Sequence, residues 1–254
     1  MRLLQLRENG EYQLTKDLVG DEVIPAYAIL SHTWGPDTDE VSYEDITKNL
    51  GKQKPGFEKL RFCAEQARTD DLHFFWIDTC CINKGSDAEL SEAINSMFRW
   101  YHNAAKCYVY LSDVNTEDTE PHDSSWMATF KRSRWHTRGW TLQELIAPRS
   151  VEFFSSAGIR LGDKGSLENE LHEITGVPKS ILQGGLLSDN EVEKRLSWMD
   201  HRRTKREEDQ AYALLGLFEV HMPLIYGEGK RNALRRLNEE IAKSTGVKQH
   251  GMCS

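Results

Sequence analysis

Short apolar runs alternate along the chain with longer segments in which apolar positions recur every three or four residues. The runs are typical of strands buried on both faces, and they cover residues 27–31, 74–78, 107–111 and 151–154. Residues 57–67 and 90–101 have a helical period, and Ser86 with Glu89 predicts a capping box before the second segment. Strands that alternate with helices predict a parallel α/β sheet with helices on both faces, which is the flavodoxin-like arrangement. We expect the first two runs to form central strands.

The two ends of the chain have different patterns. Apolar alternation in residues 3–6 and 12–14 on either side of an Asn-Gly dipeptide (9–10) predicts an N-terminal hairpin. After residue 155 the patterns are helical and predict a C-terminal helical elaboration packed on the sheet. The expected organisation is one domain over residues 1–243, with an α/β core at about 24–160, a helical extension at about 161–243 and a tail or linker start at 244–254.

Composition excludes several classes of protein. The chain has 254 residues, of which 39% are hydrophobic and 28% charged, as in an ordinary soluble globule. Its net charge of −8 argues against a general nucleic-acid binder, because phosphate contacts need a basic face. No apolar run is long enough to cross a bilayer and no signal peptide is visible, so we expect a cytoplasmic protein without membrane contact. The five cysteines indicate reduced thiols, and no metal site is assigned.

The pair Trp140 and Glu144 is the first candidate for chemistry. Both lie in the opening turns of an expected helix at i and i+4, which places them on one helix face. An indole offers a flat stacking platform, and its apolar bulk would raise the pKa of a neighbouring carboxyl group. The alternative is an amphipathic helix with a core Trp and a solvated Glu.

Polar residues at the carboxyl ends of the expected strands are the second group of candidates. Ser31 and His32 follow the first strand, and Asp78 follows the second. Ligands of parallel α/β sheets bind at these strand ends, so we expect a pocket there. Each residue has a structural alternative as well, such as capping a loop or satisfying a backbone carbonyl.

Seven motifs, in this order, closely resemble the fungal heterokaryon-incompatibility (HET) domain. They are residues 27–35 (YAILSHTWG), 40–45 (EVSYED), 76–84 (WIDTCCINK), 92–101 (EAINSMFRWY), 138–149 (RGWTLQELIAPR), 208–216 (EDQAYALLG) and 223–229 (PLIYGEG). The likeness covers residues 1–243 and is greatest to HET domains at the N-terminus of fungal NLR-type receptors. It implies NACHT and WD-repeat regions in the full-length receptor, and a role in programmed cell death after fusion of incompatible cells, a form of innate immunity.

A more distant resemblance is to TIR domains. Residues 28–38 (AILSHTWGPDT) are similar to the first strand and loop of plant TIR domains (VFLSFRGEDT), and residues 140–145 (WTLQEL) to their WCLDEL segment. The Glu of that segment is catalytic in NAD-cleaving TIR enzymes, which implies a catalytic role for Glu144. The loop departs from the pattern at residues 32–34, so substrate contacts there do not transfer one for one.

These resemblances imply a TIR-like fold and an effector that hydrolyses NAD at the nicotinamide–ribose bond when it self-associates. NAD is then the substrate, and no cofactor is expected. Glu144 would stabilise the oxocarbenium ion, Trp140 would stack on nicotinamide or ribose, and Ser31, His32, Trp34 and Asp78 would contact substrate. Two alternatives stay open: a non-enzymatic death-signalling assembly module and a metal-dependent nuclease. The reaction product, the active oligomer and the trigger also stay open.

Overall fold

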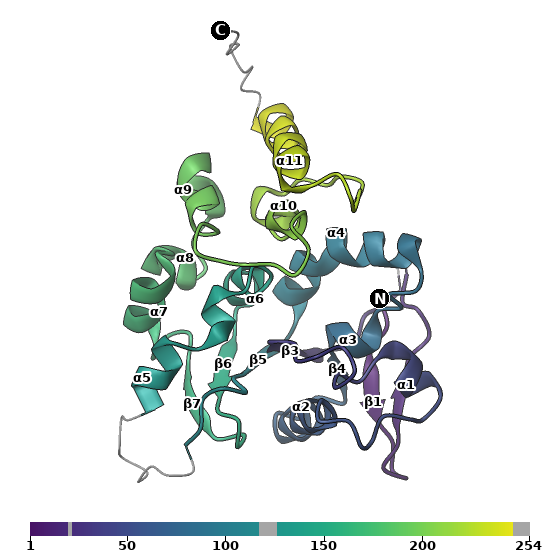
Figure 1. Cartoon of the computed structure of the whole chain (residues 1–254). Coiled ribbons are helices and arrows are strands. Elements are labelled where there is room, and N and C mark those ends of the chain that lie inside the picture. Colours follow the sequence, from purple (N-terminus) through teal and green to yellow (C-terminus); the bar gives the residue numbers. More distant parts are fainter. Residues whose placement is uncertain (20–21, 117–125, 246–254) are drawn as a thin grey trace, which may run out of the picture.

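The computed structural model describes residues 1–19, 22–116 and 126–245. At its centre lies a seven-stranded mixed sheet with the order β2-β1-β4-β3-β5-β6-β7 (Figure 1). The strands are β1 (Leu4–Leu6), β2 (Tyr12–Leu14), β3 (Tyr27–His32), β4 (Phe74–Trp76), β5 (Lys106–Tyr110), β6 (Val151–Phe154) and β7 (Arg160–Asp163).

The four inner strands β4, β3, β5 and β6 run parallel, and antiparallel strands flank them on both sides. In the register of the sheet, Ala28 of β3 lies opposite Phe75 of β4 and Lys106 of β5. Numbered along the chain, the parallel strands have the order 2-1-3-4, which is the flavodoxin-like order with its switch point between β3 and β5. The expected α/β class with a parallel core is confirmed.

The strand β3 is central and every residue in it is buried. Helices cover both faces of such a strand, which explains its continuous apolar run. The next strand, β4, is also internal, but it ends at Trp76 rather than at Asp78. Asp78 instead begins the short helix α3, so it is a helix N-terminal residue.

Helices lie on both faces of the sheet. Figure 1 shows α2 on one face, with α4 and α6 on the other. The helices are α1 (Tyr43–Thr47), α2 (Phe57–Thr69), α3 (Asp78–Cys81), α4 (Asp87–Asn103), α5 (Trp126–Lys131), α6 (Thr141–Ile146), α7 (Glu168–Thr175), α8 (Lys179–Leu182), α9 (Val192–Ser197), α10 (Asp209–Tyr212) and α11 (Lys230–Thr245), with 3₁₀ turns η1 (Arg134–Thr137), η2 (Leu187–Asp189) and η3 (Leu215–Phe218).

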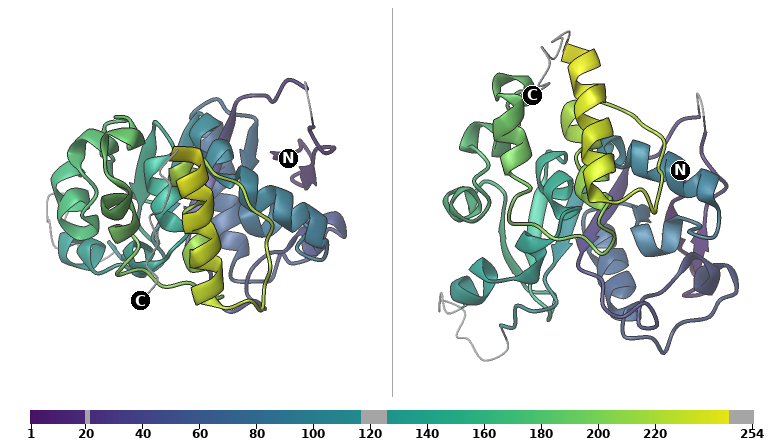
Figure 2. Two further views of the ribbon diagram at one scale, coloured as in Figure 1. Left: turned by 90° about the horizontal axis from the view of Figure 1, so that it is seen from above. Right: turned by 45° about the horizontal axis from the view of Figure 1, so that its top comes forward.

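The C-terminal helices form the expected elaboration on the α4 and α6 side of the sheet. In both views of Figure 2, α11 lies between α4 and the group formed by α7, α8 and α9. Gly216 of η3 packs so closely against Phe98 of α4 that a Cβ would overlap the Phe98 side chain. A glycine is therefore required where η3 meets α4.

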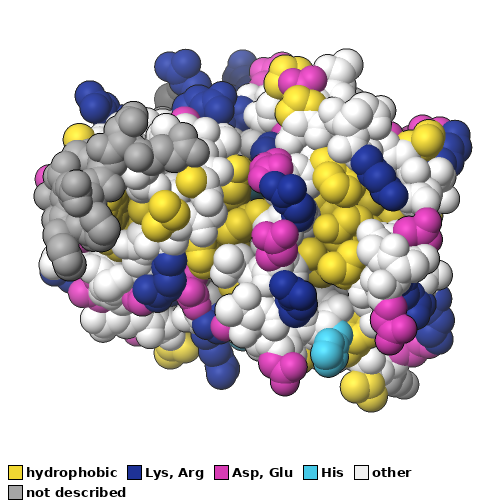
Figure 3. All heavy atoms as spheres, turned by 90° about the horizontal axis from the view of Figure 1, so that it is seen from below, with side chains coloured by type: hydrophobic (Ala, Val, Ile, Leu, Met, Phe, Trp, Pro, Cys, Tyr) yellow, Lys and Arg dark blue, Asp and Glu magenta, His cyan; other side chains and the backbone are white. Residues whose placement is uncertain are grey.

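The opposite face of the molecule is covered by α2. Its buried residues, Leu60, Cys63, Ala64 and Ala67 among them, face the sheet, as the helical period predicted. Figure 3 views this side and shows a line of Lys, Arg, Asp and Glu side chains with hydrophobic ones on either side. The pocket described below opens elsewhere, beside α4 and α6.

Other expectations are met in part. The N-terminal hairpin is confirmed, and it joins the main sheet through β1 and β4. Ser86 accepts a hydrogen bond from the Glu89 N–H, but the Glu89 carboxylate accepts from Asn83 N–H, so the capping box is only half formed. The last strand of the sheet, β7, covers residues 160–163. At the other end α11 reaches Thr245, and the remainder of the expected tail lies outside the described residues.

The cysteines that the structure describes are free, buried thiols, namely Cys63, Cys80, Cys81 and Cys107. Burial raises the pKa of each of them, which keeps them protonated. In the described part of the chain, no helix has the length and apolar character needed to span a membrane.

Candidate functional site

The short helix α6 is fixed at its start by a backbone bridge to a distant segment. Gly139 N–H donates to the Arg203 carbonyl (2.9 Å), and Arg203 N–H donates to the Thr137 carbonyl (2.6 Å). A Cβ on Gly139 would lie only 2.5 Å from Thr204 Cγ2. Glycine at position 139 therefore lets the extension pack directly against the start of α6.

Two buried cations hold the ends of the same helix. The Arg202 guanidinium donates to Thr141 Oγ1 (2.8 Å) at its start. The Lys164 ammonium donates to the carbonyls of Leu145 (3.3 Å) and Pro148 (2.5 Å) at its end, where a cation also complements the helix dipole. Burial lowers the pKa of Lys164 to about 8 and that of Arg202 to about 10.

Glu144 of α6 is buried and bound to the central strand. Ser31 Oγ donates a hydrogen bond to Glu144 Oε2, and Trp135 Nε1 donates to Ser31 Oγ (2.7 Å). Burial raises the pKa of Glu144 to about 8, although the Ser31 hydrogen bond lowers it, and the nearby Asp78 charge adds to the increase. The pKa is raised in the expected direction, but through burial of the carboxyl group rather than through the Trp140 ring alone, and the alternative of a solvated Glu is wrong.

A second buried polar cluster lies at the carboxyl ends of β3 and β4. His32 Nε2 lies 3.8 Å from Glu40 Oε2 and 3.9 Å from Asp78 Oδ1. Neither His32 Nε2 nor Asp78 Oδ1 has a hydrogen-bond partner among the described residues. The other oxygen of Asp78 accepts from Trp34 Nε1 (2.9 Å), which holds the loop after β3. Two buried, unsatisfied atoms side by side favour a ligand group that bonds to both.

Burial also sets the charges in this cluster. It lowers the pKa of His32 well below its usual value, assisted by the Lys59 and Lys84 charges, so the imidazole is neutral near pH 7. Burial raises the pKa of Asp78. Glu40 accepts hydrogen bonds from Gly35 N–H (2.6 Å) and from the Lys59 ammonium (2.5 Å).

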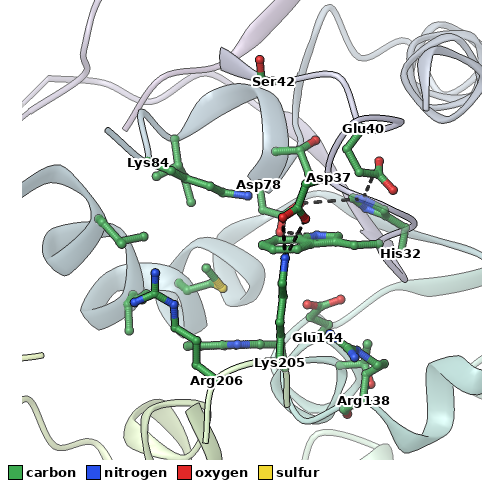
Figure 4. A pocket seen from close by; sticks show the side chains of 18 of the residues that line it. His32, Asp37, Glu40, Ser42, Asp78, Lys84, Arg138, Glu144, Lys205 and Arg206 are labelled. Atoms are coloured by element: carbon green, nitrogen blue, oxygen red, sulfur yellow. Dashed lines mark hydrogen bonds and ion pairs between the residues drawn. The ribbon is translucent and has the colours of Figure 1, made fainter. Parts of the chain in front are cut away.

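Both clusters line one pocket of about 410 Å³. Figure 4 shows the labelled side chains around it, with His32 from the end of β3, Glu40 from the loop after β3 and Glu144 from the opposite side. Its lining comes from five parts of the chain: the β3–α1 loop, the α3 region, α4, the start of α6 and the C-terminal extension. The pocket therefore lies at the carboxyl ends of the parallel strands, where ligands bind in this class of sheet.

Cations and aromatic rings share the rim of the pocket. The Lys84 ammonium lies over the Trp34 ring (3.7 Å to the centroid), and the Arg206 guanidinium over the Tyr226 ring (3.9 Å). The Arg138 side chain also lines the pocket. Of the ion pairs found in the described residues, none includes Lys84, Arg138 or Arg206. Three cations are therefore available to an anionic ligand.

One ion pair crosses the pocket rim. The Lys205 ammonium contacts both Asp37 oxygens (2.7 and 2.5 Å) and so connects the extension to the loop after β3. Both side chains are exposed, at 58% and 71%, so the contact contributes little stability. Figure 4 shows Lys205 pointing at Asp37.

The structure brings five of the six expected site residues to the pocket. They are Glu144, Trp140, His32, Trp34 and Asp78. The sixth, Ser31, is the penultimate residue of β3, fully buried, and holds Glu144 from behind instead of lining the pocket. It positions the carboxyl group.

The sequence indicates no pocket role for the rim cations Lys84 and Arg138. Arg138 stands in the most informative motif and Lys84 ends another, but neither position alone indicates a pocket. The run 202–206 (RRTKR) permits two interpretations from sequence, pinning of the C-terminal helices through ion pairs or binding of phosphate. In the structure Arg202 fixes the start of α6, through hydrogen bonds rather than an ion pair. Lys205 and Arg206, which follow it, line the pocket instead.

Among the described residues around the pocket, no group of side chains is suited to binding a metal ion. Within the described ranges, no three His, Cys, Asp or Glu side chains lie together as a set that could hold a metal ion. The groups present in the pocket are instead suited to hydrogen bonding, stacking and anion binding.

Comparisons with known proteins identify relatives. The profile of the heterokaryon incompatibility protein (HET) family matches residues 27–126. The chain is 57% identical to vegetative incompatibility protein HET-E-1 of Podospora anserina over 247 residues, which are 97% of this chain and 18% of that protein. No solved structure matches the chain, so the resemblance to TIR domains rests on sequence motifs alone.

Proposed function

The chain belongs to the heterokaryon-incompatibility (HET) family, and from that premise we propose that it acts in incompatibility between fungal cells by hydrolysing NAD at the nicotinamide–ribose bond. The observation that carries the proposal is the environment of Glu144. This buried carboxyl group lines a pocket of about 410 Å³ that also holds indole rings and cations, three of which have no carboxylate partner among the described residues. A dinucleotide offers matching groups, namely flat rings, two riboses and a diphosphate.

The chemistry requires one well-placed carboxylate. The bond between ribose C1′ and the pyridinium nitrogen breaks, and its electron pair goes to the nitrogen to give neutral nicotinamide. No acid is needed to expel this leaving group. Positive charge develops on the ribose as an oxocarbenium ion, which Glu144 would stabilise. Water then adds to C1′ and releases a proton, and the other product is ADP-ribose.

The raised pKa of Glu144 fits this role once the substrate is present. In the empty pocket a pKa of about 8 leaves most of the carboxyl group protonated at neutral pH. A bound pyridinium cation favours the carboxylate, because an opposite charge within a few ångströms lowers the pKa of an acid. Substrate binding would therefore generate the active ionisation state, and Ser31 would keep the carboxylate in place.

The other pocket groups are placed to orient the substrate. Trp140 stands directly before α6, lines the same pocket as Glu144 and offers a stacking surface for nicotinamide or ribose. The unpartnered atoms His32 Nε2 and Asp78 Oδ1 would hydrogen-bond a polar group such as a ribose hydroxyl or a carboxamide. Both contacts would exist before the bond breaks, so their loss should raise KM more than it lowers kcat.

We further propose a larger context for this domain. Since the chain covers 18% of the Podospora relative, it would work beside further regions, such as NACHT and WD repeats, and self-association in the cytoplasm would switch its activity on. Cell death would follow from loss of NAD. A domain that only assembles and recruits a partner would kill without consuming NAD.

The test is nicotinamide release from NAD by purified protein, at low concentration and when artificially clustered. Wild type and Glu173→Gln should both release nicotinamide, because Glu173 is exposed and pairs with Lys131 away from the pocket. Glu144→Gln should lose at least about a hundredfold in rate, as expected for loss of one electrostatic stabiliser. No release by clustered wild type would contradict the proposal.

A further inference from the structure

The cations on the pocket rim come from separate parts of the chain. Lys84 follows α3, Arg138 precedes α6, and Lys205 and Arg206 precede α10. Like charges that converge on one rim repel each other, and only one of these four has a carboxylate partner within the described structure. Such an arrangement favours an anionic ligand with several acceptor oxygens.

The one paired cation shows what an anion does at this rim. Asp37 extends from the loop after β3 and places both oxygens on the Lys205 ammonium. Lys205 lowers the pKa of Asp37, and Lys84 also contributes, so the carboxylate lies in the field of cations from two sides of the pocket. Asp37 itself lines the pocket.

We propose that Lys84, Arg138, Lys205 and Arg206 form a binding site for a diphosphate, and that Asp37 occupies part of this site as an internal competing anion while the pocket is empty. The ligand class is a nucleoside diphosphate derivative. The rings of Trp34 and Tyr226, which lie beside Lys84 and Arg206, give an adjacent base or ribose a surface to stack on. This inference depends on the proposed function in one respect only, the identification of the diphosphate as that of NAD.

A single salt bridge neutralises only one of the four rim cations, whereas a diphosphate can bind several of them. A carboxylate carries one charge and satisfies Lys205, while Lys84, Arg138 and Arg206 have no carboxylate partner among the described residues. A diphosphate carries more charge and more acceptor oxygens, and the planar guanidinium groups bind phosphate oxygens in pairs. The ligand would therefore displace Asp37 from Lys205 and release the loop after β3 from the extension.

The experiment measures binding of ADP-ribose, which has the diphosphate but no nicotinamide bond, by isothermal titration calorimetry. Inorganic pyrophosphate should displace it. Lys84→Ala and Arg206→Ala should each weaken binding about tenfold or more, the value of a charged hydrogen bond. Asp37→Asn should instead strengthen binding, roughly two- to fivefold, because a weak surface ion pair no longer competes. Glu173→Gln also removes one exposed carboxylate that pairs with a lysine, and it should bind like wild type.

Opposite results overturn the proposal. Unchanged binding by Lys84→Ala and Arg206→Ala, or no binding of ADP-ribose and pyrophosphate by wild type, would remove the diphosphate site. Weaker binding by Asp37→Asn, with the thermal midpoint of wild type, would show that Asp37 and Lys205 form a clasp that shapes the pocket. If wild type releases no nicotinamide yet ADP-ribose binds with these dependences, NAD hydrolysis fails and the diphosphate site stands.

Discussion

Ser31 donates a hydrogen bond to Glu144 across 113 positions of the sequence, from the central strand to the helix that faces it. The Ser31 hydroxyl has one proton and also accepts from Trp135 Nε1, an atom that can only donate. Its own proton is donated to Glu144 Oε2. Burial raises the pKa of Glu144 and this hydrogen bond lowers it. One buried hydroxyl thus connects the candidate catalytic group to the central strand and acts on its ionisation.

Removal of that hydroxyl should change the pKa of Glu144. Ser31→Ala leaves Glu144 Oε2 and Trp135 Nε1 without this partner, and we expect a loss of about 1–3 kcal/mol in the free energy of unfolding. Because the Ser31 hydrogen bond lowers the pKa of Glu144, its loss should raise that pKa above 8. NMR titration of the Glu144 carboxyl carbon measures it directly. An unchanged pKa would show that Ser31 does not set the ionisation of Glu144.

The rate of NAD cleavage should depend on the same ionisation. Glu144 acts as a carboxylate, so kcat/KM should rise with pH and level off above about pH 8, the pKa of the group in the free protein. In the complex, the pyridinium cation favours the carboxylate, so kcat should rise with pH over a lower pH range than kcat/KM does. The measurement is nicotinamide release between pH 5.5 and 9.5. A kcat/KM that does not change across this range would show that the reaction does not depend on the ionisation of Glu144.

Stability should depend on pH in the direction opposite to that of a salt-bridged acid. Glu144 has a pKa of about 8 when folded, against an ordinary 4.5. Below pH 4.5 both states carry the proton, so the group has no effect. Between 4.5 and 8 the folded state keeps a proton that the unfolded state has lost, so stability falls as pH rises. Glu144→Gln removes this cost, which is on the order of a few kcal/mol above pH 8.

Thermal melts of wild type and Glu144→Gln at several pH values test this. The variant should gain stability relative to wild type as pH rises from 5 to 9, and the gain should be smallest at pH 5. Equal differences at every pH would mean that Glu144 is not held protonated in the folded protein.

Gly139 should resist even the smallest substitution. A Cβ there would lie 2.5 Å from Thr204 Cγ2 and 2.6 Å from Met199 Cε, so Gly139→Ala must displace these two side chains, which pack against the start of α6. We expect a loss of roughly 1–3 kcal/mol, the usual cost of overpacking. Gly165→Ala is the control, because its nearest neighbour is a side-chain oxygen at 3.3 Å. Chemical denaturation compares the two, and equal stabilities would show that the contact yields easily.

The sequence predicted the fold wherever local pattern and tertiary environment agree. The run at 27–31 is apolar throughout because β3 is buried on both faces, and this feature needs no knowledge of partners. The strand β7 was missed, since it is an antiparallel edge strand with an exposed Arg160 and no apolar run. The second strand was predicted too long because Ile77 continues the apolar run although α3 begins directly after it.

The candidate site was predictable only in part, for a similar reason. Trp140 and Glu144 lie four positions apart on one helix, so local geometry places them together. Asp37 and Lys205 are separated by 168 positions, and only the packing of the extension brings them into contact. Ser31 was expected to contact substrate, but it lies behind Glu144. The residue pattern of a strand does not show which helix covers each of its faces. The parts of the site that depend on long-range packing could therefore not be predicted from sequence patterns.

The most direct test of the central claim is the NAD level of fungal cells that express the domain. Wild type and Glu173→Gln should deplete NAD before the cells die. Glu144→Gln removes one buried charge and keeps the size of the side chain, so it should leave both NAD and viability unchanged while the protein still self-associates. Full killing by Glu144→Gln in cells whose NAD does not fall would contradict the account and favour an assembly module.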